Sequence, residues 1–259
     1  MRHKLRPSGS SRWLECPASL VLSETVEQEK RMDQIAAYQG SACHELLETC
    51  VKAGHAPAEN YRGDKIEIFD EDQMTFPYTV TVDQYMIDTV QFFLDEVGIP
   101  PEGVEVHSEI NLTHSEIPEL QGTADYLSIW PDGEHGVLAD LKSGKGVVQA
   151  RNRKGEVNTQ LLSYACLIFD AYPKLQTLTL AIISPNIKTK DKTRSTGINR
   201  EDASLHLDRV KAVAKLADVA TPATLEQITK VGSQCFWCAA KNVCPTRARE
   251  SVERDFGEE

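Results

Sequence analysis

Two short segments on either side of one turn decide the fold: Gly122-Thr123-Ala124-Asp125 and Ala139-Asp140-Leu141-Lys142. Between them lie two strand-like runs separated by Pro131-Asp132-Gly133, which has the composition of a hairpin turn. The sequence therefore predicts antiparallel neighbouring strands at 123–130 and 136–142. Residues at opposite ends of such a hairpin can lie side by side, so we expect Asp125 and Asp140 to be close together.

Helices and further strands surround this hairpin. Helices are expected where the apolar spacing or the polar composition suits them, at 38–53, 80–97, 156–170 and 200–219. The alternating run 104–112 and the short apolar run 178–184 predict two more strands, the second central in the sheet. We expect irregular polar chain at 54–77 and a basic loop at 188–199. The order helix, three strands, helix, strand predicts an α/β fold with a mixed central sheet flanked by helices.

The bulk composition is that of an ordinary globular protein. The chain has 259 residues, of which 41% are hydrophobic and 26% charged. No apolar run approaches the ~20 residues that span a bilayer. The basic N-terminus is not followed by an apolar segment of signal-peptide type. We therefore expect a cytoplasmic protein without a membrane partner.

The net charge of −11 argues by itself against a nucleic-acid partner, because phosphate binding needs cationic surface. The local field matters more than the global charge. Lysine and arginine gather in the stretches 142–154, 188–194 and 241–249, whereas acidic residues concentrate elsewhere. A solvated surface is the alternative interpretation of each basic stretch.

The two aspartates and the lysine suit phosphodiester chemistry. Two neighbouring carboxylates repel each other unless a cation lies between them, and magnesium or manganese favours such oxygen-rich sites. Asp140 and Lys142 are two residues apart on a strand, so their side chains share a face. A lysine beside a metal-bound carboxylate can orient an attacking water and stabilise charge on phosphorus. Solvated residues at a strand end are the competing interpretation of the Asp-x-Lys tripeptide alone.

Four motifs in order resemble the PD-(D/E)XK nuclease superfamily in its RecB-like exonuclease branch, with its restriction-endonuclease-like αβββαβ core. These motifs are Gly40-Ser41-Ala42-Cys43-His44, Gly122 to Asp125, Asp140-Leu141-Lys142 and Gln160-Leu161-Leu162-Ser163-Tyr164. The match covers about 38–184, which we expect to be the core of a single nuclease domain spanning 1–259.

The resemblance implies a role for each matching residue. His44, Asp125 and Asp140 would bind magnesium or manganese, with the Leu141 carbonyl as a further ligand. Lys142 would be the catalytic lysine. Gln160 and Tyr164, four residues apart on one helix face, would position the substrate or that lysine. Relatives often carry an acid on the first strand, where Glu109, Glu105 and His107 are candidates, and Glu109 is the weaker addition to the set.

A second site is predicted from the cysteines. The chain has seven, which in a reducing compartment favours metal ligation or catalysis over disulfides. Cys235, Cys238 and Cys244 form a C-x₂-C-x₅-C pattern that needs a fourth ligand. Cys16 lies in a loop and is free to supply it. The other cysteines, on predicted helices among apolar residues, are expected to pack in the core and are Cys43, Cys50 and Cys166.

One distant N-terminal cysteine with a C-terminal C-x₂-C-x₅-C resembles the iron–sulfur staple of RecB-like and CRISPR-associated exonucleases. The resemblance implies a structural [4Fe–4S] cluster, with zinc as the alternative, joining 10–20 to 230–250. The opening stretch Arg6 to Pro17 also resembles phage-encoded RecB-like proteins, for which the compartment would be the host cytoplasm.

The expected function is a magnesium- or manganese-dependent deoxyribonuclease, an exonuclease on DNA ends or single strands in phage DNA processing. Recombination or replication proteins are its expected partners. One alternative is a catalytically silent nuclease fold that binds DNA or a protein, which the net charge favours. A zinc-stapled regulatory protein is a third interpretation, based on the cysteines alone.

Overall fold

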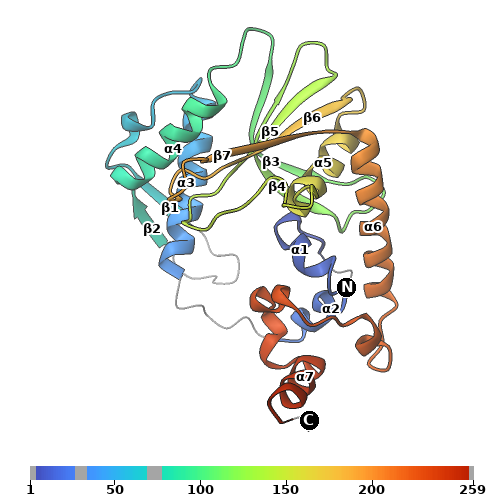
Figure 1. Ribbon diagram of the computed structural model, residues 1–259. Helices are drawn as coiled ribbons and strands as arrows, with labels where there is room; N and C mark the ends of the chain where they lie inside the picture. The colour runs from blue at the N-terminus through green and yellow to red at the C-terminus, as the bar shows by residue number, and fades with distance from the viewer. Residues whose placement is uncertain (1–3, 27–33, 69–77, 257–259) are drawn as a thin grey trace.

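The protein is described here from a computed structural model that covers residues 4–26, 34–68 and 78–256 (Figure 1). A five-stranded sheet lies at its centre, in the order β3-β4-β5-β6-β7. These strands are β3 (Glu105–Thr113), β4 (Gln121–Ile129), β5 (His135–Leu141), β6 (Thr177–Ile183) and β7 (Thr193–Asn199). The β5–β6 pair is parallel and the other pairs are antiparallel, so the predicted mixed sheet with a central β6 is confirmed.

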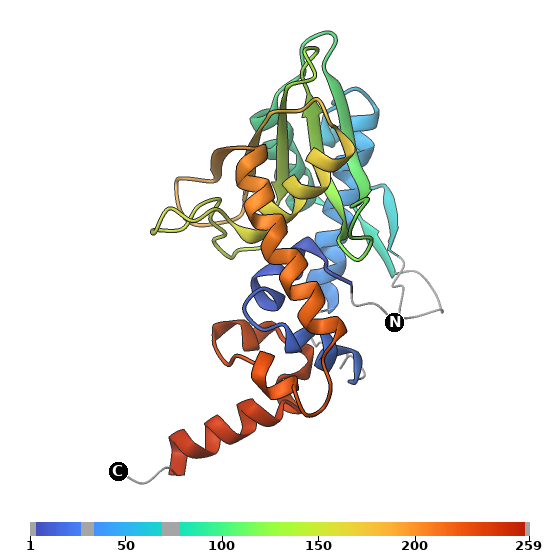
Figure 2. The same cartoon turned by 90° about the vertical axis from the view of Figure 1, so that its right-hand side faces the viewer.

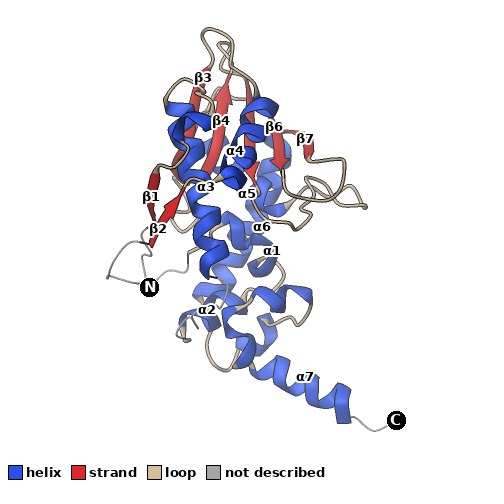
Figure 3. Cartoon of the chain, turned by 90° about the vertical axis from the view of Figure 1, so that its left-hand side faces the viewer, coloured by secondary structure: helices blue, strands red, loops and turns tan. Residues whose placement is uncertain are grey.

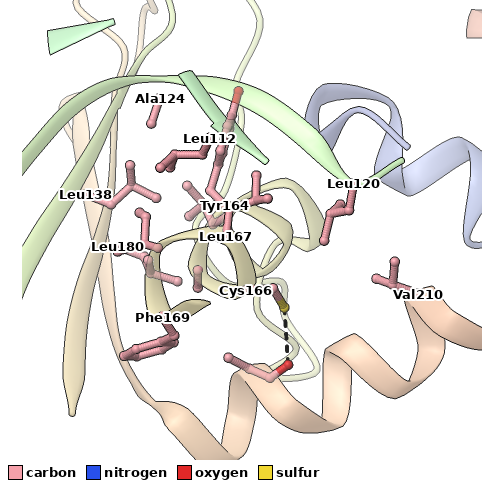
Figure 4. Packing of buried hydrophobic residues seen from close by; sticks show 14 of the residues in the cluster. Leu112, Leu120, Ala124, Leu138, Tyr164, Cys166, Leu167, Phe169, Leu180 and Val210 are labelled. Atoms are coloured by element: carbon pink, nitrogen blue, oxygen red, sulfur yellow. Dashed lines mark hydrogen bonds between the residues drawn. The ribbon is translucent and has the colours of Figure 1, made fainter. Parts of the chain in front are cut away.

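Two hydrophobic cores lie on the two faces of this sheet. On one face pack α3 (Gln34–Lys52) and α4 (Gln84–Val97), together with the small antiparallel sheet of β1 (Lys65–Ile68) and β2 (Tyr78–Thr81) (Figure 3). On the other face pack α5 (Thr159–Ala171) and α6 (Arg200–Asp218). Figure 4 shows this second core, in which Leu138 and Leu180 of the sheet meet Leu167 of α5. The predicted α/β architecture with flanking helices is therefore confirmed.

Local chemistry sets the ends of these elements. The Asn199 side chain accepts from Asp202 N–H and begins α6 with a reciprocal capping box. Asp83 and Asn158 cap α4 and α5 by a single bond, each side chain accepting a backbone N–H of the first turn. Gly98, with φ of 68°, follows the last residue of α4. In the hairpin turn before β5, Asp132 accepts from Glu134 N–H.

The chain's first and last segments pack together below the sheet (Figures 1 and 2). The first contains η1 (Pro7–Gly9), α1 (Ser10–Trp13) and α2 (Ala18–Glu24), and the last contains η3 (Leu225–Ile228), η4 (Ser233–Trp237), η5 (Ala239–Asn242) and α7 (Pro245–Phe256). Trp13 is buried in the α5/α6 core and its indole N–H donates to Arg6 O. Leu5 N–H donates to Glu119 O, which joins the N-terminal segment to the chain before β4.

Two expectations about irregular chain were wrong. The predicted basic loop at 188–199 contains β7, because Thr193–Asn199 forms seven antiparallel pairs with β6. The predicted irregular stretch at 54–77 contains η2 (Ala58–Tyr61) and β1, while 69–77 lies outside the described residues. Among the described residues, no helix has the length and apolar character that crossing a membrane requires.

Candidate metal and phosphate site

Three acidic residues lie at one level across three neighbouring strands. Ser108 pairs with Tyr126 and Ile110 with Ala124, so Glu109 of β3 lies opposite Asp125 of β4. The β4–β5 ladder ends at Tyr126 and Ala139, so the next position brings Asp140 beside Asp125. The predicted juxtaposition of the two aspartates is therefore found, with Glu109 added to the row.

The strands change face at this row. Residues two apart on a regular strand share a face. Ala124, however, belongs to the α5/α6 core and Tyr126 to the α3/α4 core. On β3, Ile110 likewise packs against the α5/α6 core, whereas Val106 packs against the α3/α4 core. Glu109 lies at this reversal with φ of 48°, an uncommon value for a residue other than glycine. The reversal places the carboxylates at the boundary between the two cores.

A histidine from α3 completes a group of three possible metal ligands. His44 Nδ1 lies 3.3 Å from Glu109 Oε1 and 3.4 Å from Asp125 Oδ1. The ligand atoms of these three residues lie within 4.8 Å of one another, a spacing found for no other such group in the described parts of the chain. One imidazole and two carboxylates form a donor set that suits Mn²⁺ and, with added waters, Mg²⁺.

The electrostatics of this triad favour a cation. Glu109 Oε1 is buried and has no hydrogen-bond partner among the described residues. Burial lowers the pKa of His44, but the charges of Asp125 and Glu109 outweigh it and raise that pKa to about 10. The protonated imidazole therefore supplies the positive charge that these carboxylates attract. A divalent ion would supply it instead and would displace the proton.

Asp140 is held differently, by a lysine and an amide. Its Oδ2 lies 2.7 Å from Lys142 Nζ, and its Oδ1 accepts from Gln160 Nε2 at 2.8 Å. Burial raises the pKa of Asp140 to about 6, although Lys142 opposes this rise. Burial also lowers the pKa of Lys142, but the Asp140 charge more than compensates and the net shift is upward. Lys142 is therefore an ammonium group fixed at the end of β5.

Tyr164 and Gln160 reach the strands from the same helix, α5. The Tyr164 hydroxyl donates to Thr123 O at 2.7 Å, two residues before Asp125 (Figure 4 shows the ring directed at β4). Burial, with the charges of Asp125 and Asp140, raises the pKa of Tyr164, so its phenol stays protonated and remains a donor. The two residues thus fix the backbone beside Asp125 and the carboxylate of Asp140.

Leu141 joins the site through its backbone N–H, which donates to Asp125 Oδ2 at 2.6 Å. Its side chain is buried in the α3/α4 core. This bond orients the carboxylate whose other oxygen faces His44. The Asp125 side chain, which comes from β4, is therefore held in place by the backbone of β5.

The predicted residues thus form two adjoining groups rather than one. His44 and Asp125 lie together as expected, and Glu109, the weaker candidate, joins them. Asp140 lies beside Asp125 but is bound to Lys142 and Gln160 and is not a member of the triad. Glu105 and His107 contact each other, with Glu105 Oε1 lying 2.6 Å from His107 Nε2.

The sequence interpretation missed three residues that hold the end of β5. Asn186 donates to Ser143 O at 2.8 Å, and it also donates to the side-chain oxygens of Tyr85 and Thr89. The Tyr85 hydroxyl donates to Ser143 O as well. Ser143 follows Lys142, so these bonds fix the chain that carries the lysine. No spacing signal connects residues so far apart in the sequence.

An open pocket of about 700 Å³ lies near this part of the sheet, but its lining includes none of His44, Glu109 and Asp125. It lies between the C-terminal end of α3 and β3, and its lining includes Ser108 and Ile110, which flank Glu109. Val51, His55 and Pro100 form other parts of its wall. The pocket is therefore separate from the candidate metal site.

The four cysteines predicted to act together come from the two terminal segments. The Cys16 thiol is close enough to Cys235 and Cys238 for their charges to raise its pKa, after burial, the larger cause. Lys230 N–H donates to Cys16 Sγ at 3.4 Å, and Ser23 Oγ lies 4.0 Å from Cys238 Sγ. Cys244, buried, follows η5 at the start of α7.

The three remaining cysteines lie in the cores, as predicted. Cys43 and Cys50 of α3 are buried in the α3/α4 core. Cys166 of α5 is buried in the other core, where its thiol donates to Ala203 O of α6 (Figure 4).

Comparison with other proteins places this arrangement in a family. No protein with a curated description matches the chain. A family model described as a protein of unknown function (DUF2800) matches residues 3–258, nearly all of the chain. The chain therefore belongs to the DUF2800 family.

Proposed function

We propose that this protein is a metal-dependent DNA nuclease of the PD-(D/E)XK class that hydrolyses phosphodiester bonds, as an exonuclease on DNA ends or single strands. One observation carries the proposal: Glu109, Asp125 and Asp140 form a row across three strands, with His44 beside two of them and Lys142 beside the third. The order of motifs along the chain, from His44 to Tyr164, supports the RecB-like assignment.

His44, Glu109 and Asp125 would hold the Mg²⁺ or Mn²⁺ ion, since their ligand atoms already lie together and the buried Glu109 Oε1 accepts no hydrogen bond from the described residues. Such an ion supplies Lewis-acid stabilisation of phosphate charge and lowers the pKa of a bound water. Asp140, next in the row, is near enough to interact with Asp125 electrostatically.

Lys142 is the residue best placed to act on the phosphate. Its ammonium group forms an ion pair with Asp140, and the other oxygen of Asp140 accepts a hydrogen bond from Gln160. A fixed positive donor can bind a non-bridging phosphate oxygen and stabilise the charge that grows there during hydrolysis. The chain Gln160–Asp140–Lys142 fixes the position of the donor before substrate arrives, which reduces the cost of reorganisation.

Two basic stretches supply the surface for the DNA backbone. The loops that contain 143–158 and 184–192 protrude on the same side of the sheet (Figure 2). Arg151 Nε donates to Thr196 Oγ1 at 3.1 Å, which links the first loop to β7. Phosphate contacts from such lysines and arginines bind nucleic acid without regard to sequence. The net charge of −11 is compatible with this because the local field governs binding.

We further propose that Cys16, Cys235, Cys238 and Cys244 hold a [4Fe–4S] cluster with a structural role, zinc being the alternative. The backbone N–H donated to Cys16 Sγ is typical of hydrogen bonding to cluster thiolates. The four sulfur atoms do not form a group within 4.8 Å. Thiolates around a single tetrahedral zinc would lie about 3.8 Å apart, from a Zn–S distance of about 2.3 Å.

A catalytically silent DNA- or protein-binding module is the second candidate function, favoured only by the acidic net charge. Retention of both acids and the lysine counts against it, because a site that has lost catalysis has no need to keep Lys142 paired with Asp140. The two candidates differ in whether the protein turns over DNA when Mn²⁺ is supplied.

The test is a cleavage assay on labelled single- and double-stranded DNA with Mn²⁺, using anaerobically purified protein. We expect cleavage by the wild type, and at least about 100-fold slower cleavage by Lys142→Ala and Asp140→Ala. Lys174→Ala is the matched control, since this exposed lysine lies outside the basic loops and should leave the rate unchanged. No cleavage by the wild type, or equal rates in all variants, would reject the proposed function, and product sizes would separate exonuclease from endonuclease.

A further inference from the structure

A buried arginine lies on the sheet two strands from Asp140. Arg194 of β7 pairs with Ile182 of β6, which pairs in turn with Asp140 of β5. Arg194 is 7% exposed, and its Nε and Nη1 groups have no hydrogen-bond partner. Its Nη2 makes one long bond, 3.4 Å, to Lys192 O. No carboxylate in the described residues forms an ion pair with it.

Such a guanidinium group is costly without a partner. A buried charge is normally paired or fully hydrogen-bonded, because its lost hydration must be replaced. Guanidinium also presents its donors in a planar fork that matches phosphate. The unused donors of Arg194 therefore indicate an anion that binds here.

The arginine faces the same side of the sheet as the proposed catalytic lysine. Residues paired across strands share a face, so Arg194 lies on the face of Ile182, in the α5/α6 core. Asp140 also faces α5, since it accepts from Gln160, and Lys142 contacts Asp140 on that side. With strands about 4.8 Å apart, Arg194 begins about 10 Å from Asp140 across the sheet.

A second unpartnered donor lies between them. Ser184 directly follows β6, and its N–H donates to Lys192 O, which extends the ladder by one step. Two residues beyond Ile182, Ser184 turns to the same face. Its hydroxyl is buried and has no hydrogen-bond partner. Lys142 N–H donates to Ile183 O, so Lys142 lies beside Ser184 at the ends of β5 and β6.

We propose that Arg194 and Ser184 form a subsite for a phosphate diester of the DNA backbone, adjoining the phosphate that Lys142 would contact. The proposal deepens the nuclease function and depends on it for the identity of the ligand. Arg194 would donate to one non-bridging oxygen through Nε or through Nη1, both of which lack a partner, and Ser184 would donate to the same phosphate. The two basic loops, the first of which is linked to β7 by the Arg151–Thr196 bond, attract the polyanion to this place.

The test is binding of a fluorescein-labelled single-stranded oligonucleotide to the full chain, over a series of salt concentrations, with EDTA to prevent cleavage. We expect Arg194→Gln to weaken binding at least about ten-fold and to reduce the salt slope by about one. Arg153→Gln removes the same charge from an exposed position in the basic loop, and we expect a loss below about three-fold. Ser184→Ala should lose about ten-fold, since its hydroxyl would donate to a charged phosphate oxygen.

The melting temperature separates a binding role from a structural one. Removal of an uncompensated buried charge should leave the melting temperature of Arg194→Gln unchanged or raise it. A fall of several degrees, or equal DNA affinities of Arg194→Gln and Arg153→Gln, would overturn the subsite. Manganese-dependent cleavage by the wild type tests the function separately. Arg194-dependent binding without any cleavage keeps the subsite and rejects the nuclease, whereas cleavage with no effect of Arg194→Gln on binding rejects the subsite alone.

Discussion

At the residue scale, Glu109 combines backbone strain with a buried carboxylate oxygen whose one ion-pair partner among the described residues is His44. A non-glycine residue at positive φ costs about 1–3 kcal/mol and persists where the surrounding structure requires it. Glu109→Gln removes the charge while it keeps the size of the side chain. We expect Mn²⁺ affinity, measured by calorimetry, to fall at least about ten-fold because an anionic ligand is lost. The melting temperature of the metal-free protein should fall slightly, since the attraction between Glu109 and protonated His44 is lost.

Glu105 offers the matched control for this substitution. It lies on the same strand, is exposed, and contacts His107 rather than the triad. Glu105→Gln should leave Mn²⁺ affinity unchanged. Equal losses in the two variants would show that Glu109 acts only through the overall charge of the protein.

A second residue, His206 of α6, makes stability depend on pH. It is 2% exposed, its Nε2 lies 2.9 Å from Ser163 Oγ, and its Nδ1 has no partner. Burial and the charge of Arg209 lower the pKa of His206 from 6.5 to about 4. Between these pH values the unfolded chain binds a proton that the folded chain does not. The free energy of unfolding should therefore decrease by up to about 3 kcal/mol as pH falls through this window.

Urea denaturation between pH 4 and 7 measures this dependence. His206→Gln can still hydrogen-bond to Ser163, but it has no titrating group, so its stability should change less with pH. His135→Gln replaces an exposed histidine and should retain the steeper dependence of the wild type. Identical slopes for the wild type and His206→Gln would contradict the assignment.

At the element scale, strands that are buried are predicted well because their residues are apolar. Strands that form only through backbone pairing with a neighbour are predicted poorly. The apolar run of β6 was recognised as a central strand. The polar stretch Thr193–Asn199 was not, because it is an edge strand whose structure comes from backbone pairing with β6. The change of face at Glu109 could not be predicted either. A prediction from alternating residues holds only while the regular pleat of the strand continues.

The loops at the ends of β5 and β6 depend on one amide, that of Asn186. Its Nδ2 donates to Ser143 O and to the hydroxyls of Tyr85 and Thr89, joining both loops to α4. Asn186→Ala leaves these part-buried groups with fewer partners and should cost about 1–3 kcal/mol of stability by urea denaturation. DNA cleavage should also slow, because Lys142 precedes Ser143. Asn152→Ala, in the exposed hairpin after β5, is the control, and equal losses in both variants would contradict this role.

At the scale of the whole molecule, the candidate site draws on elements spread across most of the core. His44, Glu109, Asp125, Asp140 and Gln160 come from α3, β3, β4, β5 and α5 in turn. The ordered motifs predicted His44, Asp125, Asp140 and Gln160, whereas Glu109 was only one of three candidates on its strand. The division into a His44–Glu109–Asp125 triad and an Asp140–Lys142–Gln160 chain was not predictable, because it depends on strand register and on the conformation of Glu109.

The two terminal segments of the chain also meet at the scale of the whole molecule. Cys16 and Lys230 are in contact although they are 214 positions apart in the sequence, and Cys235 and Cys238 lie nearby. A bound cluster would close this long loop and would stabilise the fold by restricting the unfolded chain, by about 5 kcal/mol at most on the scale of disulfide loops. Cys16→Ser should therefore lower both the iron content and the melting temperature of anaerobically purified protein.

Cys50→Ala separates this effect from the loss of any buried thiol. Cys50 lies in the α3/α4 core, away from the terminal segments, so its replacement should lower stability modestly and leave the iron content unchanged. DNA cleavage distinguishes a structural cluster from a catalytic one. Because Cys16 is not part of the His44–Glu109–Asp125 triad, Cys16→Ser should still cleave DNA at temperatures where it remains folded. Full iron content and an unchanged melting temperature in Cys16→Ser would mean that the N-terminal segment contributes no ligand and is held by packing alone, through Trp13 and Leu5.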